Sequence, residues 1–312
     1  MAIVAPVNPP SPGDFIGSET LARRAPHAQL SAMDFSPADK EALAAAVRRL
    51  ESPSLAGRLA ALAGKPVGLI QRALPAAAST AVATVAKHAL EHALEVALFS
   101  LKNRRLAGGR KLHSGLACTS GAIGGAFGLP ALAVELPITT TIMLRAIAAI
   151  AREEGEDLVD PRTGLACLEV FALGASAPNR EVPESDYFAV RDLLARGAVE
   201  VADFALDKGV VREGAPAVVR FVAQIAARFG IVVSQKATAQ AVAVVGAVGG
   251  AALNLAFAEH FQELARGHFT FRRLERIYGA DAVRADYDRL KSGLGAGSAL
   301  AHIATAKVVI VD

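Results

Sequence analysis

Two long uncharged stretches, each built around nearly the same glycine cluster, most constrain how this chain can fold. The first runs from Ser114 to Val134 and contains Gly-Ala-Ile-Gly-Gly at 121–125, and the second runs from Ala237 to Ala258 and contains Gly-Ala-Val-Gly-Gly at 246–250. Each stretch is long enough to cross a bilayer as a helix. Small residues at a four-residue spacing let two helices approach closely, so we expect both segments to be helical and to pack together centrally.

The composition of the 312-residue chain favours closely packed helices. Apolar residues make up 53% of the chain and mean hydropathy is +0.36, yet aromatics are only 5% and Trp is absent. The chain therefore lacks the tryptophan belt of many integral membrane proteins. The net charge is +3, but the basic residues are scattered and no aromatics interleave them, so we expect no nucleic-acid partner.

The cysteines and the N-terminus indicate a cytoplasmic protein. Cys118 and Cys167 both lie in apolar runs, which is typical of buried free thiols and not of a disulfide framework. The N-terminus has neither the basic region nor the apolar region of a secretory signal. We therefore expect a reducing, cytoplasmic setting.

Helical patterns dominate, and we predict an all-α fold with a single multi-helix bundle. Residues 1–35 are rich in proline without a sustained period, so they are predicted to form a flexible arm. The helical domain is expected over residues 36–291, where Ser36 can cap the first helix and Pro37 suits its first position. A Gly-rich tail is expected over residues 292–312.

Individual helices are expected over residues 76–102, 139–153, 162–173, 185–207, 216–229, 236–278 with breaks near the glycines, and 281–291. Pro130 and Pro137 are expected to divide the region before residue 139 into short helical pieces. The strand-like strings at 230–234 and 308–311 are too short and isolated to form a sheet.

One string matches a catalytic motif. His88-Ala-Leu-Glu91-His92 has the H-x-x-E-H pattern of inverted zinc proteases, in which two imidazoles bind zinc and the glutamate acts as general base. Glu169 lies at a suitable spacing for a third ligand. The rest of the same helix face is also polar, with Thr84, Lys87 and Glu95. Because a solvated helix face explains the motif without metal, we favour that interpretation and expect no cofactor.

Glu135 is the only charged residue between Lys111 and Arg145. Burying an unpaired carboxylate is costly, so a partner is expected. Pro137 frees a nearby backbone carbonyl, and three hydroxyls follow: Thr139, Thr140 and Thr141. One interpretation is a structural kink whose carboxylate is neutralised by Arg145 or by a basic residue from the C-terminal region. The other is a polar site in an apolar helical cavity that binds a lipid headgroup or another small ligand.

Basic residues flank both apolar stretches. They are Arg104, Arg105, Arg110 and Lys111 before the first stretch, and Arg266, Arg272, Arg273 and Arg276 after the second. Such flanks fit anionic headgroups at a cytoplasmic leaflet, and equally an ordinary solvated helix face. His260 and His268 are too far apart to predict a metal site. We include both, with Asn254 and Arg266, among the candidate ligand-binding residues.

Several strings together carry a family resemblance. They are Leu129-Pro130, Glu135-Leu-Pro-Ile-Thr-Thr-Thr-Ile-Met-Leu-Arg145, Glu154-Gly-Glu-Asp157, Cys167-Leu-Glu-Val-Phe-Ala-Leu-Gly174, Gly246-Ala-Val-Gly-Gly250, Asn254 and Ala265-Arg-Gly-His-Phe269. Over roughly residues 40 to 290 the chain resembles the EcsC protein family. The resemblance implies a bacterial, helical, membrane-associated protein, and the family takes its name from an operon that encodes an ABC transporter. It implies no catalytic residues.

The sequence favours a non-enzymatic protein at the inner face of a bacterial membrane, with membrane lipid or a membrane protein as its partner. No P-loop, G-x-S-x-G or CxxC motif occurs. The apolar stretches either insert in the bilayer or form a buried core, and the glycines between 115 and 128, with Pro130 and Glu135, favour a peripheral or shallowly embedded protein. The alternative is a zinc-dependent hydrolase that uses His88, Glu91, His92 and Glu169.

Overall fold

Helices make up the regular structure of the chain in the computed structural model, which describes residues 35–51, 55–72, 74–103, 132–175, 187–208, 216–242 and 247–293. The helices are α1 (Pro37–Leu50), α2 (Leu55–Ala63), α3 (Val67–Ile70), α4 (Ala76–Asn103), α6 (Leu132–Glu153), α7 (Pro161–Leu173), α8 (Tyr187–Lys208), α9 (Pro216–Val242) and α10 (Ala247–Tyr278). A further helix covers residues 280–293, and no strand occurs within the described ranges. The all-α prediction is confirmed.

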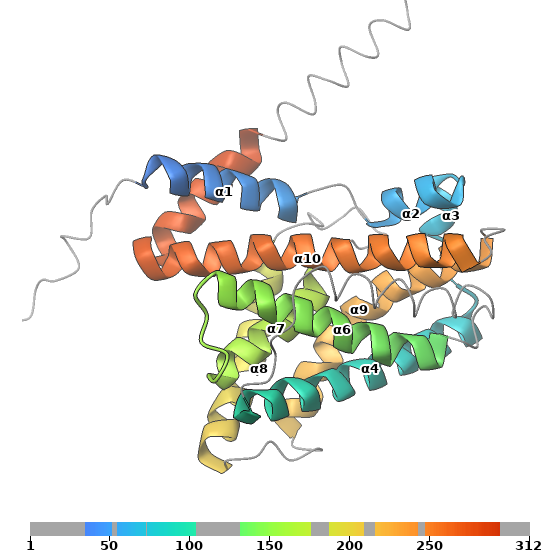
Figure 1. Cartoon of the computed structure of the whole chain (residues 1–312), viewed down its shortest axis with the longest axis horizontal. Coiled ribbons are helices and arrows are strands. Elements are labelled where there is room, and N and C mark those ends of the chain that lie inside the picture. Colours follow the sequence, from blue (N-terminus) through green and yellow to red (C-terminus); the bar gives the residue numbers. More distant parts are fainter. Residues whose placement is uncertain are drawn as a thin grey trace, which may run out of the picture.

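The long helix α10 organises the molecule. Figure 1 shows it running along the long axis, with α1, α2 and α3 on one side and α4, α6 and α7 on the other. The main core is formed by residues of α2, α3, α4 and α6 to α10, and four phenylalanine rings contact one another within it: Phe171, Phe229, Phe257 and Phe261. A smaller core surrounds Phe271 and Tyr287 and joins α1, the end of α10 and residues 280–293.

Local sequence signals set the helix starts. The Ser36 hydroxyl accepts a hydrogen bond from the Asp39 N–H at 3.1 Å, and Pro37 occupies the first helical position, as predicted. Asp160 caps α7 in the same way, accepting from the Arg162 N–H at 2.8 Å. The turn between α6 and α7 needs Gly155, whose φ of +81° lies in the left-handed region.

The expected break at Pro137 is wrong, because α6 is continuous from Leu132 to Glu153 with the proline inside it. The proline removes one intrahelical donor, and the long buried apolar face of α6 offsets that loss. The Thr141 hydroxyl donates to the Pro137 carbonyl at 2.9 Å, which gives that carbonyl a further donor.

The second apolar stretch, Ala237–Ala258, is divided between two helices and is therefore not one span. Helix α9 ends at Val242 and α10 begins at Ala247, near the expected glycine break. Residues 230–234, where a break was expected, are helical within α9. Most of the first stretch, including Gly125, lies outside the described residues, so its packing against Gly250 stays a prediction. The predicted arm and tail also lie outside them, except that Phe35 packs on Tyr278 and residues 292–293 are helical.

The N-terminal helices run antiparallel along α10. Asp39 pairs with Arg273, Arg49 pairs with Glu263 and Arg58 pairs with Glu259. Helices α1 and α10 approach closely at Gly267, where a Cβ atom would lie 2.7 Å from Leu50 Cγ and 3.2 Å from the Ala46 carbonyl oxygen. Glycine thus permits a close helix contact in this fold, at a position outside the predicted clusters.

Replacing Gly267 with alanine should lower the free energy of unfolding by about 1–2 kcal/mol, because the added methyl group overlaps α1. Gly230 in α9 is the matched control, since it is also buried and helical but a Cβ there would meet only Ala83 Cα at 4.0 Å. Gly230→Ala should raise stability by up to about 1 kcal/mol through helix propensity. Urea denaturation measures both, and equal effects of the two substitutions would contradict the close approach of α1 and α10.

Candidate functional site

A buried ion pair joins α6 to α9 inside the apolar core. The Lys236 ammonium donates to the Glu135 carboxylate, and both side chains are almost completely inaccessible to solvent. The Lys236 Nζ atom also lies 4.9 Å from the centre of the Phe257 ring on α10, within range of a cation–π contact. Burial lowers the pKa of Lys236, and the Glu135 charge opposes part of that shift.

Three other residues of the predicted site are also buried. Thr139 and Thr140 are buried on α6, and Asn254 is buried on α10. The Thr140 hydroxyl has no hydrogen-bond partner among the described residues. Glu135, Thr139, Thr140 and Asn254 are therefore buried in the fold, and ligand binding by these residues stays a prediction.

The expectation that Arg145 neutralises Glu135 is wrong. Arg145 lies on the exposed face of α6, whereas the partner is Lys236. Positions 135 and 145 are not separated by the three or four residues that place side chains together on a helix. The alternative expectation, a basic residue from the C-terminal part of the chain, describes Lys236 correctly. Sequence reasoning missed the residue itself, although Lys236 is the only charged residue between Arg228 and Glu259.

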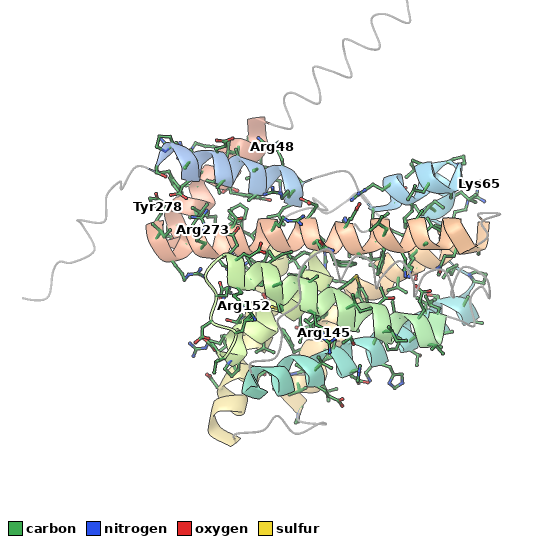
Figure 2. All side chains as sticks on the ribbon, viewed as in Figure 1. Arg48, Lys65, Arg145, Arg152, Arg273 and Tyr278 are labelled. Atoms are coloured by element: carbon green, nitrogen blue, oxygen red, sulfur yellow. The ribbon has the colours of Figure 1, made fainter. Side chains whose placement is uncertain are left out.

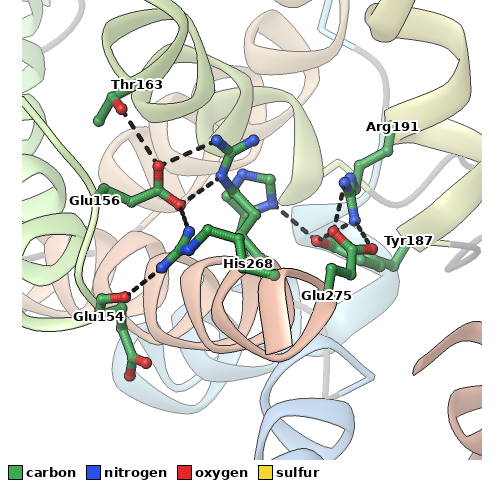
Figure 3. Close-up of polar contacts among 9 residues, drawn as sticks. Glu154, Glu156, Thr163, Tyr187, Arg191, His268 and Glu275 are labelled. Carbon is green, nitrogen blue, oxygen red and sulfur yellow. Dashed lines mark hydrogen bonds and ion pairs between the residues drawn. The ribbon is translucent and has the colours of Figure 1, made fainter. Parts of the chain in front are cut away.

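A second polar cluster lies where α7, α8 and α10 meet (Figure 3). The Tyr187 hydroxyl lies 3.0 Å from Nδ1 of His268. Arg191 donates to both oxygens of Glu275, at 2.7 and 3.0 Å, and to the Tyr187 hydroxyl at 3.3 Å. Sequence reasoning identified only His268 of this cluster, because its partners come from a part of the sequence without a recognisable motif.

Burial shifts the pKa of several groups near this cluster in the direction that favours the uncharged form. Desolvation raises the pKa of Glu169 to about 7, against the opposing charges of Arg272 and Arg191. Desolvation lowers the pKa of His268 well below its ordinary value and raises that of the Cys167 thiol. His268 and Cys167 therefore pack as neutral side chains, and Cys167 is a buried free thiol as predicted.

The arginines at the end of α10 are neutralised by the protein itself. Arg272 donates to both oxygens of Glu156 at 2.9 and 3.1 Å, and Arg276 pairs with the same carboxylate. Arg273 bridges Glu154 and Asp39, each at 2.9 Å. Although desolvation favours protonated Glu156, the two guanidiniums outweigh it and lower the pKa of that carboxyl.

Both sequence interpretations of the basic flank after the second stretch therefore need correction. Arg266 pairs with Glu263 one turn earlier on α10, so all four of the flanking arginines have acidic partners. They are neither a free patch for lipid headgroups nor an ordinary solvated face. The flank before the first stretch, at 104–111, lies outside the described residues.

His260 occupies a packing site away from His268. Its Nε2 atom is buried and lies 2.9 Å from the position that a Cβ atom of Gly174 would occupy, so the ring packs directly on the end of α7. Burial lowers the pKa of His260 to about 4, with a further contribution from the charge of Arg58. The two histidines thus belong to different parts of the core.

The residues of the alternative zinc site are not brought together. His88 and His92 lie exposed on α4, where they pair with Glu91 and Glu95 in the same helix, while Glu169 is buried in α7. Lys87 lies 3.7 Å from Glu91, as expected for an ordinary helical pair. Among the residues that the structure describes, no three His, Cys, Asp or Glu side chains are grouped to hold a metal ion.

Comparison with known proteins gives one match. A family model described as the EcsC protein family matches residues 39–274. No curated protein and no solved structure matches the chain.

The buried pair leads to a prediction about stability. Lys236→Met should lower the free energy of unfolding by about 3–5 kcal/mol, because it leaves the Glu135 carboxylate buried without its partner. The double substitution Glu135→Leu/Lys236→Met removes both charges and should restore stability to near the wild-type value. Arg49→Met, which removes a half-exposed ion pair with Glu263, is the control and should change stability by less than about 1 kcal/mol. A double variant as unstable as the single one would contradict this account.

The raised pKa of Glu169 predicts a pH-dependent stability. In the unfolded chain Glu169 ionises near 4.5, whereas in the folded protein it holds its proton to about 7. The contribution of protonated Glu169 to the free energy of unfolding is therefore complete at low pH and is lost as pH rises from about 4.5 through 7. The free energy of unfolding of Glu169→Gln, measured relative to that of wild type, should therefore increase by on the order of 3 kcal/mol between pH 4.5 and 8. Denaturation at several pH values measures this difference, and Glu41→Gln at an exposed position controls for the change of charge.

Proposed function

The chain belongs to the EcsC protein family, and from that membership and its charge distribution we propose that it is a peripheral protein of the inner membrane. It binds the cytoplasmic face of an anionic bilayer with the end of the bundle that contains α2, α3 and the start of α6, and it does so without catalysing a reaction.

The segregation of acidic residues is the observation that carries this proposal. The sequence has no Asp or Glu at 52–90, 96–134 or 214–258. These segments include α2, α3, all of α9 and the first part of α10. Helix α10 packs on α6, and Glu135 near the start of α6 is neutralised by Lys236 of α9. Helices α2 and α3 therefore carry no carboxylate that would repel anionic lipid, and Glu259 beside α2 is paired with Arg58.

Exposed apolar side chains lie at the same end. Val134 and Ile138 are both exposed and lie one turn apart on α6, and Leu62 and Val67 are exposed on α2 and α3. Figure 2 shows Lys65 at this end of the long axis and Arg273 and Tyr278 at the other. Apolar side chains next to cations suit the boundary between headgroups and acyl chains.

Two helices are long and apolar enough to cross a membrane by length and composition: Leu132–Glu153 and Pro216–Ala241. In the folded chain, 56% and 44% of their most apolar windows are already buried against other helices. They also hold the two partners of the Glu135–Lys236 pair. Their apolar faces are thus already partly buried within the bundle, which supports peripheral binding over insertion.

Vesicle flotation tests this function with the full chain. Vesicles containing phosphatidylglycerol should carry the protein to the top of a gradient, and vesicles of phosphatidylcholine alone should not. At 1 M salt, where the screening length is about 3 Å, most of the protein should be released. Carbonate should also extract it from native membranes without detergent.

Three outcomes would contradict the proposal in different ways. No binding to either vesicle or to native membranes would exclude membrane association. Binding to native membranes alone would favour a membrane-protein partner. Resistance to carbonate would show that helices cross the bilayer.

A further inference from the structure

We propose that the turn between α2 and α3, residues 61–68, is the part of the molecule that enters the headgroup layer of an anionic bilayer. This inference rests on the proposed membrane function and names the structural element that performs it.

The backbone of the turn is fixed by its own hydrogen bonds. Helix α2 ends at Ala63, and Gly64 follows with a φ of +61°. The Lys65 N–H donates to the Ala60 carbonyl at 3.0 Å and the Gly64 N–H donates to the Ala61 carbonyl at 3.3 Å, the arrangement of a Schellman turn. Pro66 then precedes the first residue of α3. Because the turn is already ordered, it does not have to become ordered on binding.

The two faces of this hairpin differ sharply in exposure. Its inner side chains are completely buried in the main core: Leu55, Ala56, Leu59, Ala60 and Ile70. At the tip, Leu62 is 48% exposed and Val67 is 40% exposed. Helices α2 and α3 both pack on α9, and α2 also packs on α10. The hairpin is thus held firmly from within while its apolar tip faces outward.

The charge of the tip specifies the kind of surface that it fits. Lys65 and Arg72 are exposed, and neither forms an ion pair with any residue that the structure describes. The arginines of α10, in contrast, are paired with Glu154, Glu156 and other acids. Free cations beside two exposed aliphatic side chains complement lipid phosphates above an acyl layer. A protein partner with an apolar pocket would not require that excess of positive charge.

A matched pair of double variants tests this inference by vesicle flotation. Leu62→Glu/Val67→Glu places two carboxylates at the tip, and it should reduce partitioning onto phosphatidylglycerol vesicles by about tenfold or more. Val159→Glu/Ile277→Glu makes the same chemical change at positions that are 55% and 48% exposed near the opposite end. This control should bind within about twofold of wild type. Since all four positions are exposed, both variants should keep wild-type circular dichroism.

The fluorescence of an attached dye gives a second test, which is made on protein that still binds the vesicles. A single cysteine at Leu62 or at Ile277, in a chain with Cys118→Ala and Cys167→Ala, carries an environment-sensitive dye. Phosphatidylglycerol vesicles should shift the emission of the dye at position 62 to shorter wavelength and leave the dye at 277 unchanged.

The outcomes separate this inference from the proposed function. If wild type fails to bind phosphatidylglycerol vesicles, both are wrong. If wild type binds while Leu62→Glu/Val67→Glu binds equally well, or the dye at position 62 does not respond, the protein binds membranes through another surface. Equal loss in both double variants would show that added negative charge anywhere weakens binding, and it would also overturn the assignment to this turn.

Discussion

The unequal distribution of charge along α10 is the constraint on which the rest of the structure depends. The first part of this helix carries no charge before Glu259 and supplies Phe257 and Phe261 to the main core. The later part carries Arg272, Arg273 and Arg276, which bind the acidic turn after α6. Neighbouring helices follow the same division, because an uncharged helix face can be covered only by apolar faces and a charged one needs partners of opposite sign. The bundle therefore has an apolar, acid-free end and an end held together by ion pairs.

The general architecture could be predicted from sequence because it depends on local patterns. Helical periodicity, the Ser36 cap and Pro37 each act over a few residues, and each led to a correct prediction. The break at Pro137 was predicted wrongly because the cost of one lost backbone hydrogen bond is local, whereas the burial that keeps α6 continuous comes from the tertiary fold. The partners of Glu135, Arg272 and Arg273 could not be predicted, since they are one hundred or more residues away in sequence. Only the tertiary fold brings such residues together.

The motifs that stood out most in the sequence have ordinary roles in the structure. His88 and His92 lie on a solvated helix face, and the basic residues after the second apolar stretch form internal ion pairs. In both cases the sequence identified the residue type correctly but could not show which charges were already neutralised. The close approach of helices through glycine does occur, at Gly267, where the sequence offers one glycine between Arg266 and His268 in place of a repeated cluster. Isolated glycines in a polar segment give no periodic signal by which to recognise a contact.

The distinction between neutralised and free cations is the reason why we propose the end with α2 and α3 as the membrane-binding surface. Counted by sequence alone, the end of α10 is the more basic region, but each of its arginines lies beside a carboxylate. Drawing an arginine away from such a partner toward a phosphate would expose the carboxylate to the same anionic surface, so little attraction remains. Lys65 and Arg72 have no such partner among the described residues, and no acidic residue occurs between Glu51 and Glu91 to provide one. Two free cations therefore attract an anionic bilayer more effectively than a larger number of paired ones.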